Sequence, residues 1–192
     1  MSRLLICGFG PFPAAPDNPA GDAVTKLRSE GWAPKGSSAA YTLLSTVWTE
    51  ASEQALAAAI DSRCDGVLLV GVAVGAGAFR VETLARNHAD PAKLDAKGEA
   101  WAQAVIDPQG PDAIEATAPT EAMRDAVAAA GLPVALSSDA GDYLCNFTFY
   151  RTLGAKRPCG FLHVPSLSDA IGLDDILRGV SAAAEAFAAQ LG

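Results

Sequence analysis

Apolar residues along this chain form short continuous runs, which alternate with longer stretches whose apolar positions recur at helical spacing. Short runs that end at glycine or proline are typical of strands covered on both faces. We therefore expect strands at 3–9, 41–47, 65–75, 81–87, 134–140 and 159–165. The stretches between them are amphipathic and rich in alanine, which favours helices. We expect helices at 19–31, 49–60, 120–130 and 168–191, and a helix-compatible stretch at 143–153.

This alternation of strands and helices predicts an α/β fold with an open, twisted, mostly parallel sheet and helices on both faces. The sequence shows no repeat, linker or composition shift, so we expect residues 1–192 to form a single domain. In such sheets, sites form at the carboxyl ends of the strands. The segment 88–112 is polar and contains three prolines and two glycines. We expect it to leave the core as a hairpin or a flap.

Composition and charge narrow the classes of function. Of the 192 residues, 50% are hydrophobic and 19% are charged, as in a globular protein, and the net charge is −8. Nucleic acids and anionic membranes attract basic faces, so we expect neither as a partner. No apolar run is long enough to span a bilayer. The opening residues, MSRLLICGFGPF, reach glycine and proline too early for a signal peptide, and we expect a cytoplasmic protein.

The cysteines and histidines argue against a metal site. The four cysteines are Cys7, Cys64, Cys145 and Cys159; they form no CxxC pair, and the chain has two histidines. A structural zinc site needs four closely spaced ligands, so we expect no metal. In the reducing cytoplasm we expect free thiols instead of disulfides.

Cys145 stands in the stretch DAGDYLCNFTFY, between a predicted strand and the helix-compatible segment. If Asp142 caps that helix, Cys145 is its third residue and lies in the first turn. The unpaired backbone N–H groups of a first turn favour a thiolate and can form an oxyanion hole. This arrangement suits a cysteine hydrolase. The alternative, from the local pattern alone, is a buried structural thiol, as many cysteines are.

His163 is the better candidate for the base that a cysteine nucleophile needs. It lies in FLHVP, near the carboxyl end of a predicted strand, whereas His88 lies where the chain turns polar and is expected to be solvated. The alternative for His163 is a histidine packed in the core. A third group should orient the imidazole. Glu82, Asp139 and Asp142 are rival candidates, and chemistry alone does not choose among them.

Four motifs of the chain are informative because of the order in which they occur. They are GFGPF (8–12) followed by Asn18-Pro19, the segment 71–87 ending in E-x-x-A-x-N, SSDAGDYLCN (137–146), and FLHVP (161–165). Together they resemble the pyroglutamyl-peptidase I family of cysteine peptidases, also called pyrrolidone-carboxylate peptidases. The resemblance runs from the first strand to His163, and the final helix fits it too. GFGPF alone is a weak signal, but the ordered set is specific.

The resemblance implies a phosphorylase/hydrolase-like fold and an enzyme that removes N-terminal pyroglutamate from peptides. Cys145 would attack the carbonyl that joins pyroglutamate to the next residue. His163 would act first as base and then as acid, and Glu82 would orient His163. A thioester acyl-enzyme would form, and water would release pyroglutamate.

The resemblance also implies a ring pocket and an assembly state. Phe9, Phe12 and Val72 would line the pocket for the lactam ring, because flat apolar faces bury a small neutral ring well. Ordinary core packing is the alternative for both phenylalanines. Family members are commonly cytosolic homo-oligomers, and they need no metal or organic cofactor.

The chain departs from the family pattern near these motifs. Ala76 stands where the family usually carries an arginine after the glycines, and Arg80 is a candidate substitute. Asp142 replaces a small hydroxyl residue, and a carboxylate near Cys145 disfavours the thiolate. Pro-Ala-Ala-Pro at 13–16 replaces the usual glycines, and Ser166 replaces an aromatic residue. These changes bear on substrate identity more than on reaction type.

Three hypotheses follow from the sequence. The first is a cysteine peptidase that removes N-terminal pyroglutamate. The second keeps the Cys-His-Glu chemistry and changes the substrate to another small acyl-amide. The third is a relative that retains the fold as a binding or assembly module after losing the arginine at position 76.

Overall fold

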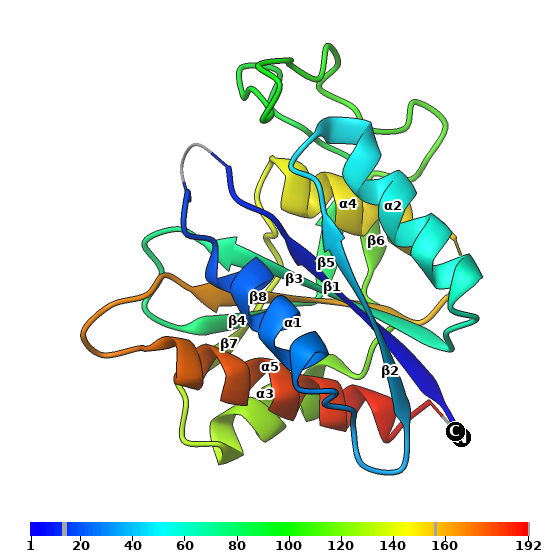
Figure 1. The fold of residues 1–192 in the computed structure, drawn as a ribbon. Helices are drawn as coiled ribbons and strands as arrows, with labels where there is room; N and C mark the ends of the chain where they lie inside the picture. Colours follow the sequence, from blue (N-terminus) through cyan, green and yellow to red (C-terminus); the bar gives the residue numbers. More distant parts are fainter. Residues whose placement is uncertain (13–14, 156, 192) are drawn as a thin grey trace.

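A six-stranded sheet forms the centre of the computed structural model, which describes residues 1–12, 15–155 and 157–191 (Figure 1). The strand order is β2-β1-β3-β8-β4-β7, and every neighbouring pair is parallel except β4 with β8. The strands are β1 (Arg3–Phe9), β2 (Ser38–Leu44), β3 (Gly66–Ala73), β4 (Phe79–Glu82), β7 (Val134–Ser137) and β8 (Cys159–Pro165). The predicted mostly parallel α/β fold is therefore confirmed.

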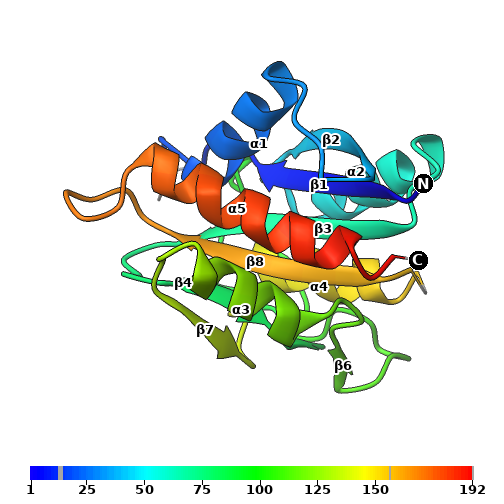
Figure 2. The same cartoon turned by 90° about the horizontal axis from the view of Figure 1, so that it is seen from below.

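Helices cover both faces of this sheet (Figure 2). One face carries α1 (Pro19–Ser29), α3 (Thr120–Ala129) and α5 (Leu173–Ala188), and the other carries α2 (Trp48–Asp61) and α4 (Leu144–Leu153). Along β1, Leu4 and Ile6 pack in the first layer, and Leu5 and Cys7 pack in the second. Because both faces of the central strands are buried, their sequences are continuous apolar runs instead of alternating patterns.

Local sequence signals predict the start of α1 correctly and the start of α5 wrongly. Asn18 caps α1 as its sequence suggests, since its side chain accepts a hydrogen bond from the Ala20 amide and proline follows at the first helical position. The last helix begins at Leu173 and not near 168, so that prediction was wrong. Ser168 and Ile171 instead form a tight turn, in which each amide donates to the carbonyl of the other.

The strand predicted at 81–87 is broken into two. Thr83 separates β4 from β5 (Leu84–Arg86), and its amide and its hydroxyl both donate to the Ser137 carbonyl. The chain therefore leaves the main sheet, and β5 pairs with β6 (Ala113–Glu115) in a separate two-stranded sheet. The strand predicted at 41–47 is also displaced, because β2 spans 38–44 in register with β1.

The segment 88–112 leaves the main sheet, as predicted, but Ala89 and Ile106 are buried in the core layer that also contains residues of α2 and α4. It forms no helix, and its only strand-like pairing is a single bridge between Leu94 and Ala100. Figure 1 shows it in green, looping beyond the end of α2. Within the described parts of the chain, no helix is both long enough and apolar enough to cross a membrane.

Candidate active site

Cys145 is the second residue of α4, which starts just after the loop that leaves β7. Tyr143 is the residue before the first helical turn, and no side chain caps it, so the prediction that Asp142 caps this helix was wrong. The Asp142 carboxylate is instead paired with the Lys93 ammonium. The first helical hydrogen bond runs from the Phe147 amide to the Tyr143 carbonyl, which leaves the earlier amides of the turn without intrahelical partners.

His163 and Glu82 form a buried pair. The imidazole Nδ1 lies 2.7 Å from Glu82 Oε1, and the two residues are 6% and 0% exposed. Glu82 is the last residue of β4, and the antiparallel register places it opposite Phe161, two residues before His163 on β8. With Nδ1 committed to the carboxylate, Nε2 is the nitrogen left to face other groups.

The surroundings of His163 favour its protonated form. Burial alone lowers the pKa of His163, but attraction to the Cys145 thiolate and the bond to Glu82 outweigh it and raise the pKa to about 9. The second carboxylate oxygen of Glu82, Oε2, is buried and has no hydrogen-bond partner among the described residues. The imidazolium is therefore the main compensation for the charge of this carboxylate.

Gly71 brings the cysteine and the histidine to one place. It pairs with His163 across β3 and β8. A Cβ atom built on Gly71 would lie 2.8 Å from Cys145 Sγ and 2.8 Å from the Phe161 ring. The sulfur thus rests against the strand backbone at the residue next to His163, in space that only glycine leaves open. The sequence signal for this role is a glycine inside the apolar run GVLLVGVA, which often marks close approach of another group.

The rival residues lie elsewhere or have other partners. Asp139 accepts a hydrogen bond from the Gly141 amide, and Asp142 pairs with Lys93, so neither carboxylate contacts the imidazole of His163 through a hydrogen bond. His88 is exposed, as predicted, and its carbonyl accepts a hydrogen bond from the side chain of the residue that follows Cys145. The structure therefore brings together Cys145, His163 and Glu82 from among the candidates.

A small apolar pocket adjoins Cys145. Phe9, Phe12 and Val72, the three residues expected around a ring, all line it, together with Asn18, Thr46, Tyr143 and Leu144. Its volume is about 20 Å³, which is room for about one water molecule. Three polar side chains of the pocket already donate to carbonyls: Asn18 to Gly10, Thr46 to Pro11 and Tyr143 to Leu94. The pocket must widen before it can admit a five-membered ring.

A wider cleft of about 400 Å³ opens beside this pocket and contains both Cys145 and His163. Arg80 lines this cleft, whereas Ala76 does not. Ser166 lies outside both cavities, and its hydroxyl accepts a hydrogen bond from the Gly75 amide, which ties the end of β8 to the turn after β3. Of the four replaced positions at 13–16, residues 13–14 lie outside the described residues.

The start of the segment 88–112 is fastened to the part of the chain that carries Cys145. The Asp90 amide donates to the Asp142 carbonyl at 2.8 Å, and the Tyr143 hydroxyl donates to the Leu94 carbonyl at 2.8 Å. The Lys93–Asp142 ion pair joins the same two segments. Asp142 is one of the residues that depart from the family pattern, and the Lys93 ammonium beside it offsets its negative charge.

Asn146 completes this attachment, and sequence reasoning missed it. Its side chain accepts from the Arg86 amide and donates to the carbonyls of Arg86 and His88, each at 2.8 Å, and it is fully buried. Its signal in the sequence was an amide side chain within the mostly apolar helical stretch LCNFTFY. These bonds fix the first turn of α4, and hence Cys145, relative to β5.

We expect Asn146→Ala to lower the free energy of unfolding by about 2–4 kcal/mol, because it removes three buried hydrogen bonds and leaves their backbone partners unpaired. Chemical denaturation followed by circular dichroism measures this change. A loss below about 1 kcal/mol would contradict the role assigned to Asn146.

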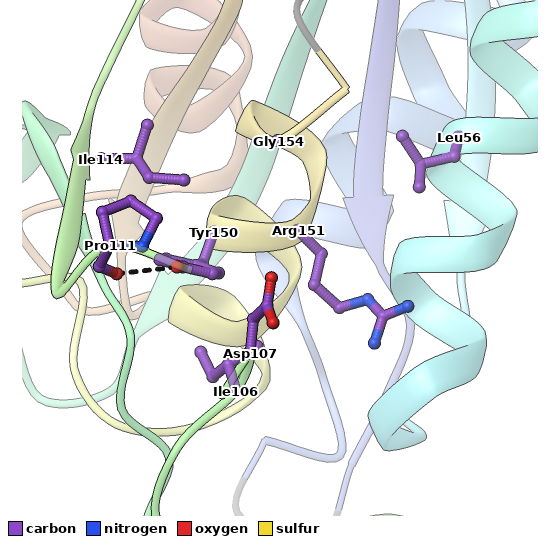
Figure 3. Close-up of a pocket in the computed structure, with 8 residues that line it drawn as sticks. All are labelled: Leu56, Ile106, Asp107, Pro111, Ile114, Tyr150, Arg151 and Gly154. Carbon is purple, nitrogen blue, oxygen red and sulfur yellow. Dashed lines mark hydrogen bonds between the residues drawn. The ribbon is translucent and has the colours of Figure 1, made fainter. Parts of the chain in front are cut away.

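A third cavity, of about 490 Å³, lies away from Cys145 beside α2 and α4 (Figure 3). Asp107 and Arg151 are its charged lining residues, and the Tyr150 hydroxyl donates to the Pro111 carbonyl at its edge. Its lining residues include no cysteine and no histidine. Across the described residues, no group of three or more His, Cys, Asp or Glu side chains could hold a metal ion.

A family model described as pyroglutamyl peptidase matches residues 2–190 of this chain. The chain belongs to the pyroglutamyl peptidase family. Two curated relatives named pyrrolidone-carboxylate peptidase are each 34% identical to it. The relative from Levilactobacillus brevis aligns over 96% of both chains. The relative from Deinococcus radiodurans aligns over 99% of this chain and 96% of its own.

Solved structures agree with this membership of the pyroglutamyl peptidase family. The crystal structure of pyroglutamyl peptidase I from Bacillus amyloliquefaciens superposes with a TM-score of 0.92 at 25% identity, covering 100% of this chain and 97% of that one. A mutant pyrrolidone carboxyl peptidase from Pyrococcus furiosus gives 0.89 at 25% identity, covering 99% and 100%. The predicted family, fold and enzyme class, a cysteine peptidase, are confirmed.

Proposed function

We propose that this family member cleaves pyroglutamate from the N-terminus of peptides with Cys145 as nucleophile, His163 as base and acid, and Glu82 as the residue that orients His163. One observation carries the proposal. The buried 2.7 Å contact between His163 and Glu82 stands beside Gly71, on which the Cys145 sulfur rests. This contact supports the proposed roles, because acyl transfer by a cysteine requires a nucleophile, a base and a group that orients the base.

The reaction proceeds in two halves. The Cys145 thiolate attacks the carbonyl carbon that joins pyroglutamate to the next residue. The electrons of this carbonyl bond move to its oxygen. His163 then donates its proton to the departing amine as the C–N bond breaks, which leaves a thioester and a neutral imidazole. In the second half, His163 takes a proton from water, the hydroxide attacks the thioester, and the sulfur leaves as thiolate. Pyroglutamic acid is released and the imidazolium is restored.

The first turn of α4 stabilises the charge that develops in both halves. Cys145 is the second residue of α4, so the amides without intrahelical partners and the positive end of the helix dipole belong to the same turn as the attacking sulfur, close to where the carbonyl oxygen becomes negative. Lys93 limits the opposing effect of the nearby Asp142 carboxylate.

The lactam ring enters the apolar pocket next to Cys145. The side chains of Phe9, Phe12 and Val72 give it an apolar lining. The carbonyl and the N–H of the ring also need hydrogen-bond partners, which the groups around the widened pocket must supply. We further propose that the enzyme acts in the cytoplasm as a homo-oligomer, as the family resemblance implies; light scattering after gel filtration tests the assembly state.

Hydrolysis of fluorogenic amides tests the proposed function. We expect kcat/KM for a pyroglutamyl amide to exceed that for the matching prolyl amide at least about a hundredfold, because the prolyl ring lacks the carbonyl that polar groups of a lactam site bind. Equal turnover of both amides would contradict pyroglutamate as the substrate. Turnover of a different small acyl-amide alone would favour the second hypothesis drawn from the sequence.

Gly71→Ala is expected to lower kcat about ten- to a hundredfold, since the added methyl displaces Cys145 Sγ and small misplacements of reacting groups are costly. Gly77→Ala is the matched control, because a Cβ there meets no atom within 4 Å. Steady-state kinetics at temperatures well below each melting point measure the effect. If folded Gly71→Ala keeps its kcat, catalysis does not require the contact between Cys145 Sγ and Gly71.

A further inference from the structure

Besides His163, which is protonated at neutral pH and bound to Glu82, the open cleft beside Cys145 contains four charged side chains, which are Arg80, Lys93, Asp139 and Asp142. Lys93 and Asp142 are paired with each other. The Arg80 side chain is exposed and makes no hydrogen bond or ion pair with any other described residue. Its guanidinium is therefore the cation of this cleft that is available to a ligand.

The strand register fixes where Arg80 stands. Arg80 lies directly opposite His163 in the antiparallel pairing of β4 with β8. Directly opposed residues project from the same face, with Cβ atoms about 4.5–5.5 Å apart. Glu82, two residues along β4, shares that face and binds His163. Arg80 thus sits beside the imidazole on the outer, solvent-facing side of the catalytic pair.

This side of the imidazole is where the leaving peptide must lie. The ring pocket holds the pyroglutamyl side of the scissile bond, and His163 protonates the amine on the other side. The open cleft is the cavity that contains both reacting side chains, so the residue after pyroglutamate extends into it and past Arg80.

We propose that Arg80 is a specificity-determining residue that binds a carboxylate on the leaving side of the substrate. The inference rests on the proposed function. The carboxylate belongs either to an acidic side chain that follows pyroglutamate or to the free C-terminus of a pyroglutamyl dipeptide. A guanidinium recognises either one through paired N–H···O bonds.

Asp139 opposes this preference. It is exposed in the same cleft, and within the described chain its carboxylate has no ion-pair partner. Its negative charge repels a substrate carboxylate, so Asp139→Asn is expected to strengthen the preference for acidic substrates.

Three substrates test Arg80: pyroglutamyl-alanine amide, pyroglutamyl-alanine with its free C-terminus, and pyroglutamyl-aspartate amide. We expect kcat/KM for at least one carboxylate substrate to exceed that for the neutral amide by about five- to tenfold at low salt. In Arg80→Gln this ratio should fall to about one, and Arg80→Lys should keep part of it. The substrate that shows the preference identifies which carboxylate is bound.

The control variant is Arg124→Gln, which removes an equal charge from α3, outside the cleft. A ratio near one in the unmodified enzyme, a ratio unchanged by Arg80→Gln, or an equal fall in Arg124→Gln would each overturn the inference and leave the proposed function intact. If none of the three substrates is hydrolysed, the proposed function fails and the inference fails with it. Melting temperatures confirm that the variants are folded.

Discussion

Cys145→Ala is expected to lower kcat for a pyroglutamyl amide by at least about a thousandfold, because the thioester half-reaction then has no nucleophile. His163, Glu82 and the ring pocket remain in place, so substrate binding should change far less than turnover. Progress curves at high enzyme concentration measure the residual rate. Activity within tenfold of the unmodified enzyme would show that another group attacks the substrate.

The other thiols provide matched controls. Burial raises the pKa of Cys7, Cys64 and Cys159, and Cys7 in β1 and Cys159 in β8 are fully buried. These thiols stay protonated and have no histidine hydrogen-bonded to them. We expect Cys159→Ala to retain turnover within a few-fold. Loss of activity in folded Cys159→Ala would contradict the choice of nucleophile.

Glu82→Gln is the second change with a large expected effect, a loss in kcat of about 10²- to 10⁴-fold. The amide keeps the shape of the side chain and removes the charge that stabilises the imidazolium of His163. Its NH₂ group can also donate to Nδ1, which would hold the wrong tautomer for catalysis. Full turnover in Glu82→Gln would show that the 2.7 Å contact is structural.

The pH dependence of Glu82→Gln separates catalysis from packing. Since the pKa of His163 is raised to about 9, its proton is present at neutral pH and is lost as the pH rises through that value. Activity that requires the proton for the leaving amine should therefore decline above about pH 9. Glu82 is one of the causes of the raised pKa, so Glu82→Gln should move this decline to lower pH. If the alkaline decline of activity stays at the same pH in Glu82→Gln, that decline is caused by a group other than His163.

Much of the fold was predictable because its signals are local. Continuous apolar runs such as RLLICGF identify strands covered on both faces, and Asn18-Pro19 identifies the start of α1. The carboxyl ends of parallel strands meet at one edge, which is why Cys145 and His163 could be expected near each other. The order of the motifs added Glu82, which chemistry alone could not separate from Asp139 and Asp142.

The rest depended on contacts between distant segments. The antiparallel course of β4, which places Arg80 and Glu82 on the same face as His163, follows from pairing and not from its own four residues. The local pattern suggested that Asp142 caps α4, but in the structure Asp142 is paired with Lys93, 49 residues away. Local patterns carry no information about such partners, and for that reason the place of the segment 88–112 could not be predicted.

Labelling with a pyroglutamyl chloromethyl ketone tests the assignment of Cys145 most directly. The thiolate that attacks the substrate displaces chloride and forms a stable thioether, which tryptic mapping by mass spectrometry locates. The account predicts one adduct per chain, on Cys145, formed in step with loss of activity and prevented by free pyroglutamate. Loss of activity with the adduct on Cys7, Cys64 or Cys159, or full activity with Cys145 modified, would contradict it.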